Sequence, residues 1–185
     1  LVVALVLALR WWTGYDIDPA RALWLGVFHS VSSFNNAGFA LFSDNLMGFV
    51  ADPWICLPIC ASIILGGLGF PVIMELRRKI RFPRSWTLNT ITVVVGTVVL
   101  LIVGAVALTV LEWSNPATLG ALDPAGRVLG GFTASVMPRT AGFNSIDIAQ
   151  MHPASWLVTD ILMFIGGGPA GTAGGLKITT FAVLY

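Results

Sequence analysis

The chain has 185 residues, of which 56% are hydrophobic and only 10% are charged, and its formal net charge is +1. Soluble domains usually carry about 25% charged residues, so the composition predicts an integral membrane protein. Its expected partner is the lipid bilayer, and no nucleic acid is expected. Five of the ten basic residues lie within eight positions, at Arg77, Arg78, Lys79, Arg81 and Arg84. By the positive-inside rule, the basic loop 77–84 is cytoplasmic.

The first half of the chain is typical of a helix, a short helix and a helix. Residues 1–12 are apolar and end in Trp11-Trp12, which indicates a spanning helix that leaves the membrane at an aromatic interface. A helix over residues 20–35 would be roughly 24 Å long. This is too short and too polar for a lipid-facing span, and it favours a re-entrant pore helix. Residues 37–52 return to the outside, and residues 53–73 form the next span.

The second half repeats this order. Residues 87–111 form the clearest spanning helix, residues 125–137 form a second short helix, and the helix that begins at Pro153 stops after Ile165. The sequence therefore predicts an all-α membrane protein with two helix, re-entrant loop, helix modules, residues 1–84 and 85–185, and a broken last helix. Both ends of the chain are apolar, so we expect an internal part of a longer transporter.

Two glycine turns occupy equivalent places in the modules. Ala-Gly-Phe occurs at residues 37–39 and again 104 positions later, and Gly-Gly pairs at 66–67 and 166–167 interrupt the helices that follow. Self-similarity of this kind predicts duplicated membrane modules. Backbone carbonyls of a re-entrant loop can replace the hydration shell of a cation, and the C-terminus of a short helix adds partial negative charge. The candidate ion-binding filter positions are Asn36, Ala37, Gly38, Phe39, Thr140, Ala141, Gly142 and Phe143. The alternative is an ordinary turn.

Residues 166–177 contain six glycines and a proline in the middle of an apolar helix. A phosphate-binding loop needs Lys directly after Gly, whereas Leu176 separates Gly175 from Lys177, so nucleotide binding is excluded. We expect a flexible gate or a substrate site; the alternative is a passive glycine patch for helix packing. The candidate gate positions are Gly166, Gly167, Gly168, Gly171, Thr172, Gly174, Gly175 and Lys177.

Three charges are expected inside the membrane, where charge is costly and usually paired. Arg139 is expected to brace the filter through carbonyl or carboxylate contacts, and Lys177 to hold the gate from below. Asp160 is expected either to serve function or to join helices by an ion pair. His29 and His152 are placed at the outer interface without a role. No Ser/His/Asp set, carboxylate pair or metal cluster is evident, so no enzyme and no bound cofactor are expected.

These motifs resemble the potassium-translocating membrane subunit of the Trk/Ktr/HKT superfamily. Residues 28–39 look like its second pore loop, residues 136–144 like its third, and residues 162–177 like its intramembrane gating loop. The resemblance implies four repeats around one pore, of which this chain would hold two, in a multi-pass protein of the plasma (cell inner) membrane. It further implies a homodimer and a cytosolic nucleotide-binding regulatory subunit.

Glycine at both filter positions favours K⁺ as the ion bound at the filter. Two alternatives stay open. One is a sodium-conducting or sodium-coupled relative, since the first filter of the family is not among these residues. The other is a non-conducting membrane scaffold subunit.

Overall fold

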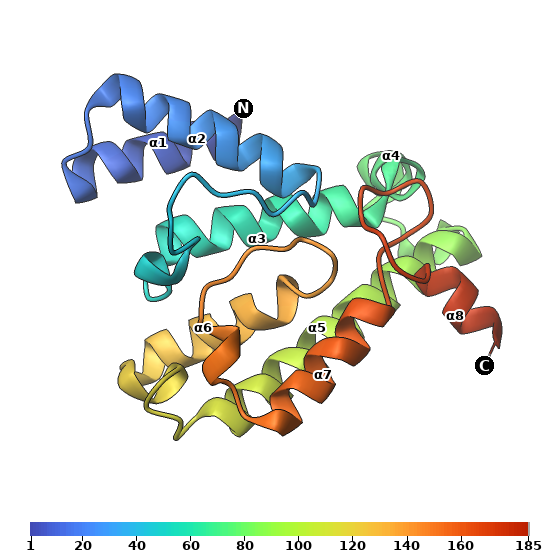
Figure 1. Cartoon of the computed structure of the whole chain (residues 1–185). Helices are drawn as coiled ribbons and strands as arrows, with labels where there is room; N and C mark the ends of the chain where they lie inside the picture. Colours follow the sequence, from blue (N-terminus) through green and yellow to red (C-terminus); the bar gives the residue numbers. More distant parts are fainter. Residues whose placement is uncertain (185) are drawn as a thin grey trace.

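The computed structural model describes residues 1–184, which form α-helices joined by loops and short 3-10 turns (Figure 1). The all-α class that the sequence predicts is confirmed for this part of the chain. The helices are α1 (Val2–Tyr15), α2 (Pro19–Phe34), α3 (Pro53–Leu68), α4 (Phe70–Lys79), α5 (Leu88–Glu112), α6 (Pro124–Val136), α7 (Pro153–Phe164) and α8 (Ile178–Leu184). The 3-10 turns are η1 (Met47–Phe49), η2 (Pro83–Ser85), η3 (Leu119–Ala121) and η4 (Ile148–Gln150).

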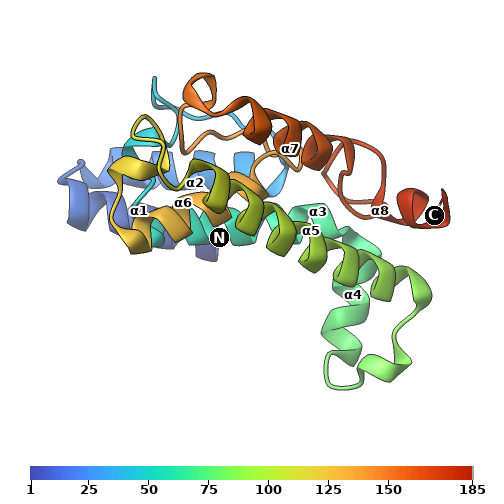
Figure 2. The same ribbon diagram turned by 90° about the horizontal axis from the view of Figure 1, so that it is seen from below.

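The helices form two groups of three. In the first group α2 packs on α1, and both pack on α3; in the second, α6 and α7 pack on α5. The groups meet where α3 contacts α6, near the centre of Figure 1. Figure 2 shows α4 and the loop after it projecting away from the other helices. The short helices α2 and α6 therefore hold equivalent places in their groups.

Both short helices begin with Asp-Pro. The Asp18 carboxylate accepts hydrogen bonds from the backbone N–H groups of residues 20 and 21, and Asp123 accepts one from residue 126. Asp satisfies the free N–H groups of the first turn, and the φ of Pro19 and Pro124 is already suited to the first helical position. These two caps explain why each helix begins within one residue of its predicted start.

Helix α5 is the one helix among residues 1–184 that is long and apolar enough to cross a membrane by itself. The pair α3 and α4 reaches that length only as a span bent by 102°. The stretch predicted as one span, residues 53–73, is therefore two helices that meet at a sharp bend at Gly69. The helix ends at Leu68, because Gly69 takes a φ of 89° and Pro71 cannot donate the hydrogen bond that would continue it.

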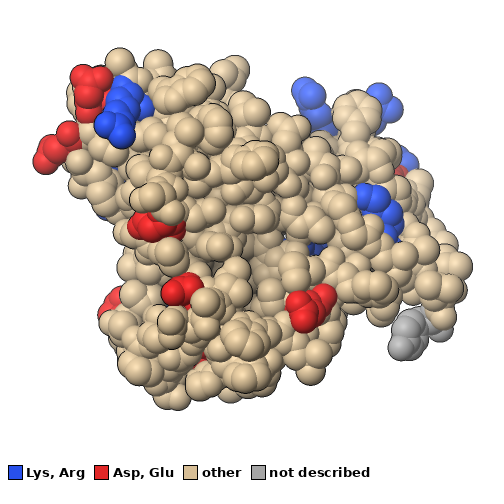
Figure 3. All heavy atoms as spheres, viewed as in Figure 1, with Lys and Arg blue, Asp and Glu red and all other residues tan. Residues whose placement is uncertain are grey.

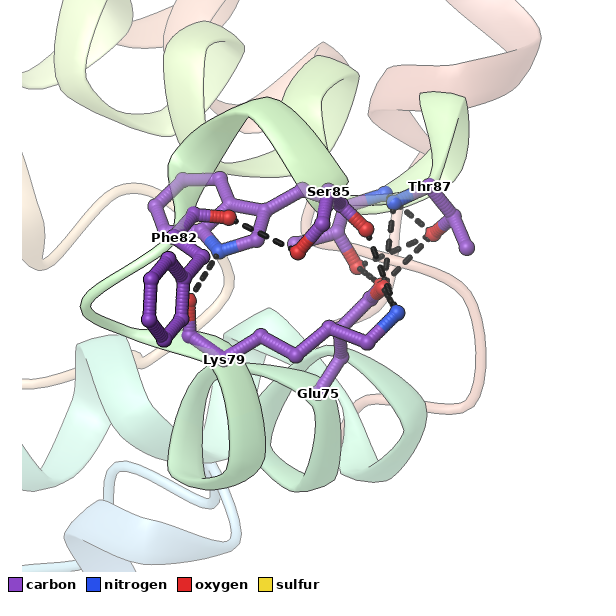
Figure 4. A network of polar contacts seen from close by, with 7 residues as sticks. Glu75, Lys79, Phe82, Ser85 and Thr87 are labelled. Atoms are coloured by element: carbon purple, nitrogen blue, oxygen red, sulfur yellow. Dashed lines mark hydrogen bonds and ion pairs between the residues drawn. The ribbon is translucent and has the colours of Figure 1, made fainter.

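A polar network fastens the basic loop between α4 and α5 (Figure 4). The Glu75 carboxylate accepts hydrogen bonds from the hydroxyls of Thr90 (2.6 Å) and Thr87 (2.7 Å), from the Thr87 N–H, and from Lys79. These hydrogen bonds lower the pKa of Glu75 to about 2. Figure 3 shows Lys and Arg gathered at this end of the molecule, while most Asp and Glu lie at the other end.

The core between α1 and α2 is aromatic. Trp11 and His29 are fully buried, and the His29 ring stacks on Phe42 and Phe143. Trp11 therefore packs inside the protein, whereas its neighbour Trp12 is exposed; the position of this pair at the membrane interface stays a prediction. The His29 ring fills the space between the first group and the loop that carries Phe143.

Candidate functional site

The two predicted filter turns take positive φ at matching positions. In the first turn (residues 35–39), Asn36 has a φ of 50° and Gly38 a φ of 71°; in the second turn (residues 139–143), Thr140 has 69° and Gly142 has 76°. Positive φ is uncommon for residues other than glycine, and most unusual for a β-branched threonine. Two such residues, two positions apart, therefore recur at the spacing of 104 noted in the sequence.

The turns touch each other at their glycines. A Cβ atom added to Gly38 would lie 2.6 Å from the Gly142 Cα and 2.5 Å from the carbonyl oxygen of Ala141. A Cβ added to Gly142 would meet the Gly38 Cα at 3.3 Å. Position 38 therefore has no room for a side chain, whereas position 142 is less crowded.

The turns present unused carbonyl oxygens. Within residues 1–184, no hydrogen bond is accepted by the carbonyls of Asn36, Ala37, Gly38, Thr140, Ala141 and Gly142. The Phe39 carbonyl differs, because it accepts a hydrogen bond from the Ser32 hydroxyl. No group of three His, Cys, Asp or Glu side chains in the described chain could hold a metal ion. Among the described residues, six backbone carbonyl oxygens of these turns are thus left without a hydrogen bond.

The loops that leave the two turns are also joined. The Leu46 N–H donates to the Asn144 carbonyl at 2.9 Å, and the Asn144 N–H donates to the Asn45 side chain at 3.2 Å. Phe143 reaches His29 on α2. The second turn is therefore held by the first helix group as well as by its own.

The glycine loop (residues 166–177) begins where α7 ends, as the sequence predicts. Its base is closed by two hydrogen bonds, from the Gly166 N–H to the Leu176 carbonyl and from the Leu176 N–H to the Phe164 carbonyl. The chain between these residues folds back toward α3 and the two turns (Figure 1).

This loop packs on the end of α3. The Gly168 N–H donates to the Gly67 carbonyl at 2.8 Å, and the Thr172 N–H donates to the Gly66 carbonyl at 3.0 Å. A Cβ on Gly167 would collide with the Gly67 carbonyl oxygen. The two Gly-Gly pairs that lie 100 residues apart in sequence are thus in contact.

The glycine loop is also bonded to both predicted pore segments. The Thr172 hydroxyl donates to the Phe34 carbonyl, at the last residue of α2, over 2.9 Å. The Gly174 N–H donates to the Thr140 hydroxyl, in the second turn, over 2.9 Å. The loop therefore lies against the C-terminal end of one short helix and against the turn that follows the other.

The three predicted membrane charges have different surroundings. Arg139 is 7% exposed and its Nη2 donates to the Gly166 carbonyl at 3.2 Å. Lys177 donates to the Ala173 carbonyl within the glycine loop. Asp160, expected to be buried, is exposed on α7, and no ion pair involves it among residues 1–184. It lies on a face of α7 that no described helix covers.

Sequence reasoning missed the role of Glu112. Its carboxylate, at the end of α5, is fully buried. It accepts four hydrogen bonds, from Asn115 (2.7 Å), Thr118 (2.6 Å), the His152 N–H (2.8 Å) and Ser155 (2.5 Å). The sequence signal for this role was a carboxylate at the end of an apolar helix, followed by Ser, Thr and Asn. Glu112 fastens the end of α5 to the start of α7.

In the first group, Asp52 makes the equivalent connection between helices. It is 6% exposed, caps α3 through the Trp54 N–H, and accepts hydrogen bonds from Arg10 (2.7 Å) and Tyr15 (2.9 Å) at the end of α1. Each group thus uses one buried carboxylate to join its first and third helices.

A family model described as cation transport protein, TrkH, matches residues 1–185. The chain belongs to this family. The predicted resemblance to the Trk/Ktr/HKT membrane subunits is confirmed, and the TrkH family consists of cation transport proteins of the membrane, not of enzymes.

Individual relatives agree with this assignment. Ktr system potassium uptake protein B of Bacillus subtilis (strain 168) is 41% identical over 184 residues, which cover 100% of this chain and 41% of that protein. The protein of the same name from Vibrio alginolyticus is 43% identical, over 88% of this chain and 36% of its own length. Potassium/sodium uptake protein NtpJ of Enterococcus hirae is 39% identical, over 89% and 36%. The chain spans about two fifths of the length of these relatives.

Proposed function

We propose that this chain contributes part of the ion-conducting pore of a potassium uptake system. The observation that carries the proposal is the meeting, at Gly38 and Gly142, of two turns that take positive φ at matching positions and have six unused carbonyl oxygens. The names of two relatives, both potassium uptake protein B, support potassium as the ion.

The proposed mechanism involves no covalent chemistry. K⁺ gives up hydration water to carbonyl oxygens and moves down its electrochemical gradient. Helices α2 and α6 direct the partial negative charge of their C-termini toward the turns that follow them. Two turns supply only part of a ligand ring, and the expected four-repeat architecture supplies the remainder.

The glycine loop is the proposed gate. Its hydrogen bonds to Phe34 and Thr140 keep it against the inner side of both turns. Ion flow then requires the loop to move away. This movement breaks the hydrogen bonds to Phe34 and Thr140, which therefore control opening. Irregular backbone can lie at this depth because neighbouring protein satisfies its polar groups.

Sodium is the second candidate ion, and the printed name of the relative NtpJ, a potassium/sodium uptake protein, favours testing it. A scaffold without conduction is the remaining alternative. It predicts that substitutions at Gly142 leave ion flux unchanged.

The proposed setting is the plasma (cell inner) membrane, with the basic loop 77–84 on the cytoplasmic side. A Ktr system, named for two relatives, has further components. This supports a cytosolic nucleotide-binding regulatory subunit and a homodimer of the membrane subunit as the expected assembly.

K⁺ and Na⁺ uptake into liposomes tests the proposal, using the intact natural protein that carries this sequence. Gly142→Ser should abolish K⁺ uptake at matched incorporation, because it adds a side chain at the turn. Gly48→Ser is the matched control, since Gly48 is exposed in η1 and an added Cβ would approach only the Asp44 side chain, at 3.2 Å, and it should keep wild-type flux. Equal flux in all three proteins would favour the scaffold, and Na⁺ uptake equal to K⁺ uptake would favour the sodium alternative.

A further inference from the structure

Arg139 is a buried cation without a carboxylate partner. Its Nη2 donates to the Gly166 carbonyl (3.2 Å) and lies 3.4 Å from the Thr97 hydroxyl on α5. No acidic side chain pairs with it in the described chain. Its Nε has no hydrogen-bond partner there either. Burial of an unpaired charge is costly, so some other source of negative potential must compensate.

Four helix ends supply this potential. The guanidinium shares a small cavity with Asn36, just after α2, with Gly67 in the last turn of α3, with Val136 at the end of α6, and with Gly167, just after α7. The C-terminus of a helix carries about half a unit of negative charge. The ends of α2, α3, α6 and α7 together therefore take the place of a carboxylate.

The cavity also contains unused polar groups. Both side-chain amide atoms of Asn36 lack a hydrogen-bond partner, as does the Arg139 Nε. The cavity volume of about 10 Å³ is close to the minimum of about 10–15 Å³ that one water molecule needs. A single water could therefore bridge the first turn, through Asn36, to the second turn, through Arg139.

We propose that Arg139 is a positioning residue that couples the second turn to the glycine loop. Its backbone begins the turn that presents Gly142, and its side chain holds the first residue of the loop. Undocking of the loop would remove the Gly166 carbonyl and leave the guanidinium unsatisfied. The inference rests on the proposed function, since it assigns a physical link between the proposed filter and the proposed gate.

Coupling of this kind is reciprocal. If an ordered turn helps Arg139 to reach Gly166, then K⁺ bound at the turn should favour the docked loop. Loss of the side-chain link should free the loop and remove its response to K⁺. A purely structural arginine would not give the loop a response to the ion.

The test measures the reaction of a single cysteine with a thiol reagent in the intact protein, after replacement of the native cysteines. Ala173→Cys is suitable because Ala173 is 3% exposed and lines the cavity. With Arg139 present, the labelling rate should be slower in K⁺ than in choline. Arg139→Met should raise the rate about tenfold or more, as expected for loss of a charged hydrogen bond, and should abolish the difference between K⁺ and choline.

Two further variants test whether the charge of residue 139 or its contact with Thr97 is responsible for the effect. Arg139→Lys keeps the charge and should restore part of the K⁺ response, which keeps the test valid if Arg139→Met does not fold. Thr97→Val removes only the longer contact and should leave both rates near those of the parent. Unchanged labelling in Arg139→Met and Arg139→Lys would overturn the proposal, as would a changed K⁺/Na⁺ flux ratio with normal labelling.

The same experiment distinguishes failure of the proposed function. If the parent protein passes no K⁺ into liposomes while Arg139→Met still accelerates labelling, Arg139 holds the loop but the loop gates no potassium pore. If K⁺ passes and labelling never depends on Arg139, the pore assignment stands and the coupling falls.

Discussion

The first turn (residues 35–39) and the second turn (residues 139–143) take positive φ at matching positions but have different surroundings. Phe39 is 70% exposed, whereas Phe143 is 2% exposed and stacks on His29. Ala37 is exposed and Ala141 is buried. For the glycines the first turn is the more crowded one, because an added Cβ would meet closer atoms at Gly38 than at Gly142.

This difference separates the cause of the turn's shape from the cause of its stability. Positive φ at matching positions in unequal surroundings indicates that this feature follows from local sequence, since each turn places a left-handed residue two positions before glycine. Burial of Phe143 fixes the second turn in the core. The first turn rests on the second through the contact at Gly38.

The largest difference in stability is expected between the variants Gly38→Ala and Gly142→Ala. Left-handed backbone costs each alanine about 1–2 kcal/mol, but at position 38 the methyl group also collides with the backbone of the second turn. Gly38→Ala should therefore fail to give folded protein, while Gly142→Ala should fold with a lower Tm. Size-exclusion chromatography and thermal unfolding in detergent measure both. Equal Tm values would contradict the contact between the turns.

For Phe39 and Phe143, substitution should cost more stability in the second turn than in the first, which is the reverse of the order expected for the glycines. Phe143→Ala should lower the free energy of unfolding by about 3–5 kcal/mol, because it opens a cavity in the core. Phe39→Ala should change it by less than about 0.5 kcal/mol, as expected for an exposed site. Thermal unfolding of the two variants side by side gives the answer, and a large loss in Phe39→Ala would show that Phe39 is covered in the intact protein.

Glu112→Gln should have an intermediate effect confined to the second group. The amide NH₂ would replace one carboxylate oxygen and face a group that can only donate, either the His152 N–H or the Asn115 NH₂, which costs about 1–3 kcal/mol for unsatisfied groups. Asp16→Asn, at an exposed acidic position outside both turns, is the control and should keep wild-type stability. Proteolysis of residues 113–152 should accelerate in Glu112→Gln only; equal protection would mean that the carboxylate is dispensable.

The smallest effect is expected far from both turns, at Glu75. Its pKa is lowered from 4.5 to about 2, so its contribution to stability is complete above pH 4.5 and is lost as the pH falls toward 2. Glu75→Gln should flatten this part of the profile of Tm against pH without changing Tm at pH 7 as much as Glu112→Gln does. An unchanged acid slope would exclude the network of Figure 4 as its source.

Local signals predicted the helices and the turns. Asp-Pro caps, apolar lengths and glycine positions placed α2, α6 and the end of α7 within two residues. Contacts between distant segments were beyond such signals. Nothing in the sequence near Trp11 indicates that its ring packs on His29, and no local pattern pairs Gly67 with Gly167. The bend at Gly69 also depends on the loop, because the Phe70 N–H donates to the Ala170 carbonyl.

For the candidate site, too, the sequence predicted individual residues but not their contact partners. The glycines and Arg139 were identifiable by residue type and position, whereas the Gly166 carbonyl that binds Arg139 was not. The buried state of Glu112 depends on hydroxyls that reach it from as far along the chain as Ser155. Such partners are set by tertiary packing, which periodicity along one helix does not report.

The contact of α3 with the glycine loop has a consequence for water. Helix α3 has 16 residues and α7 has 12, so they extend about 24 Å and 18 Å in a hydrocarbon layer of about 30 Å. Loop backbone occupies the place where both helices stop, and two of its N–H groups, those of Gly168 and Thr172, donate to α3 carbonyls. Opening the loop must replace these bonds by hydration. The position of the loop should therefore respond to osmotic stress, with excluded solutes favouring the docked state.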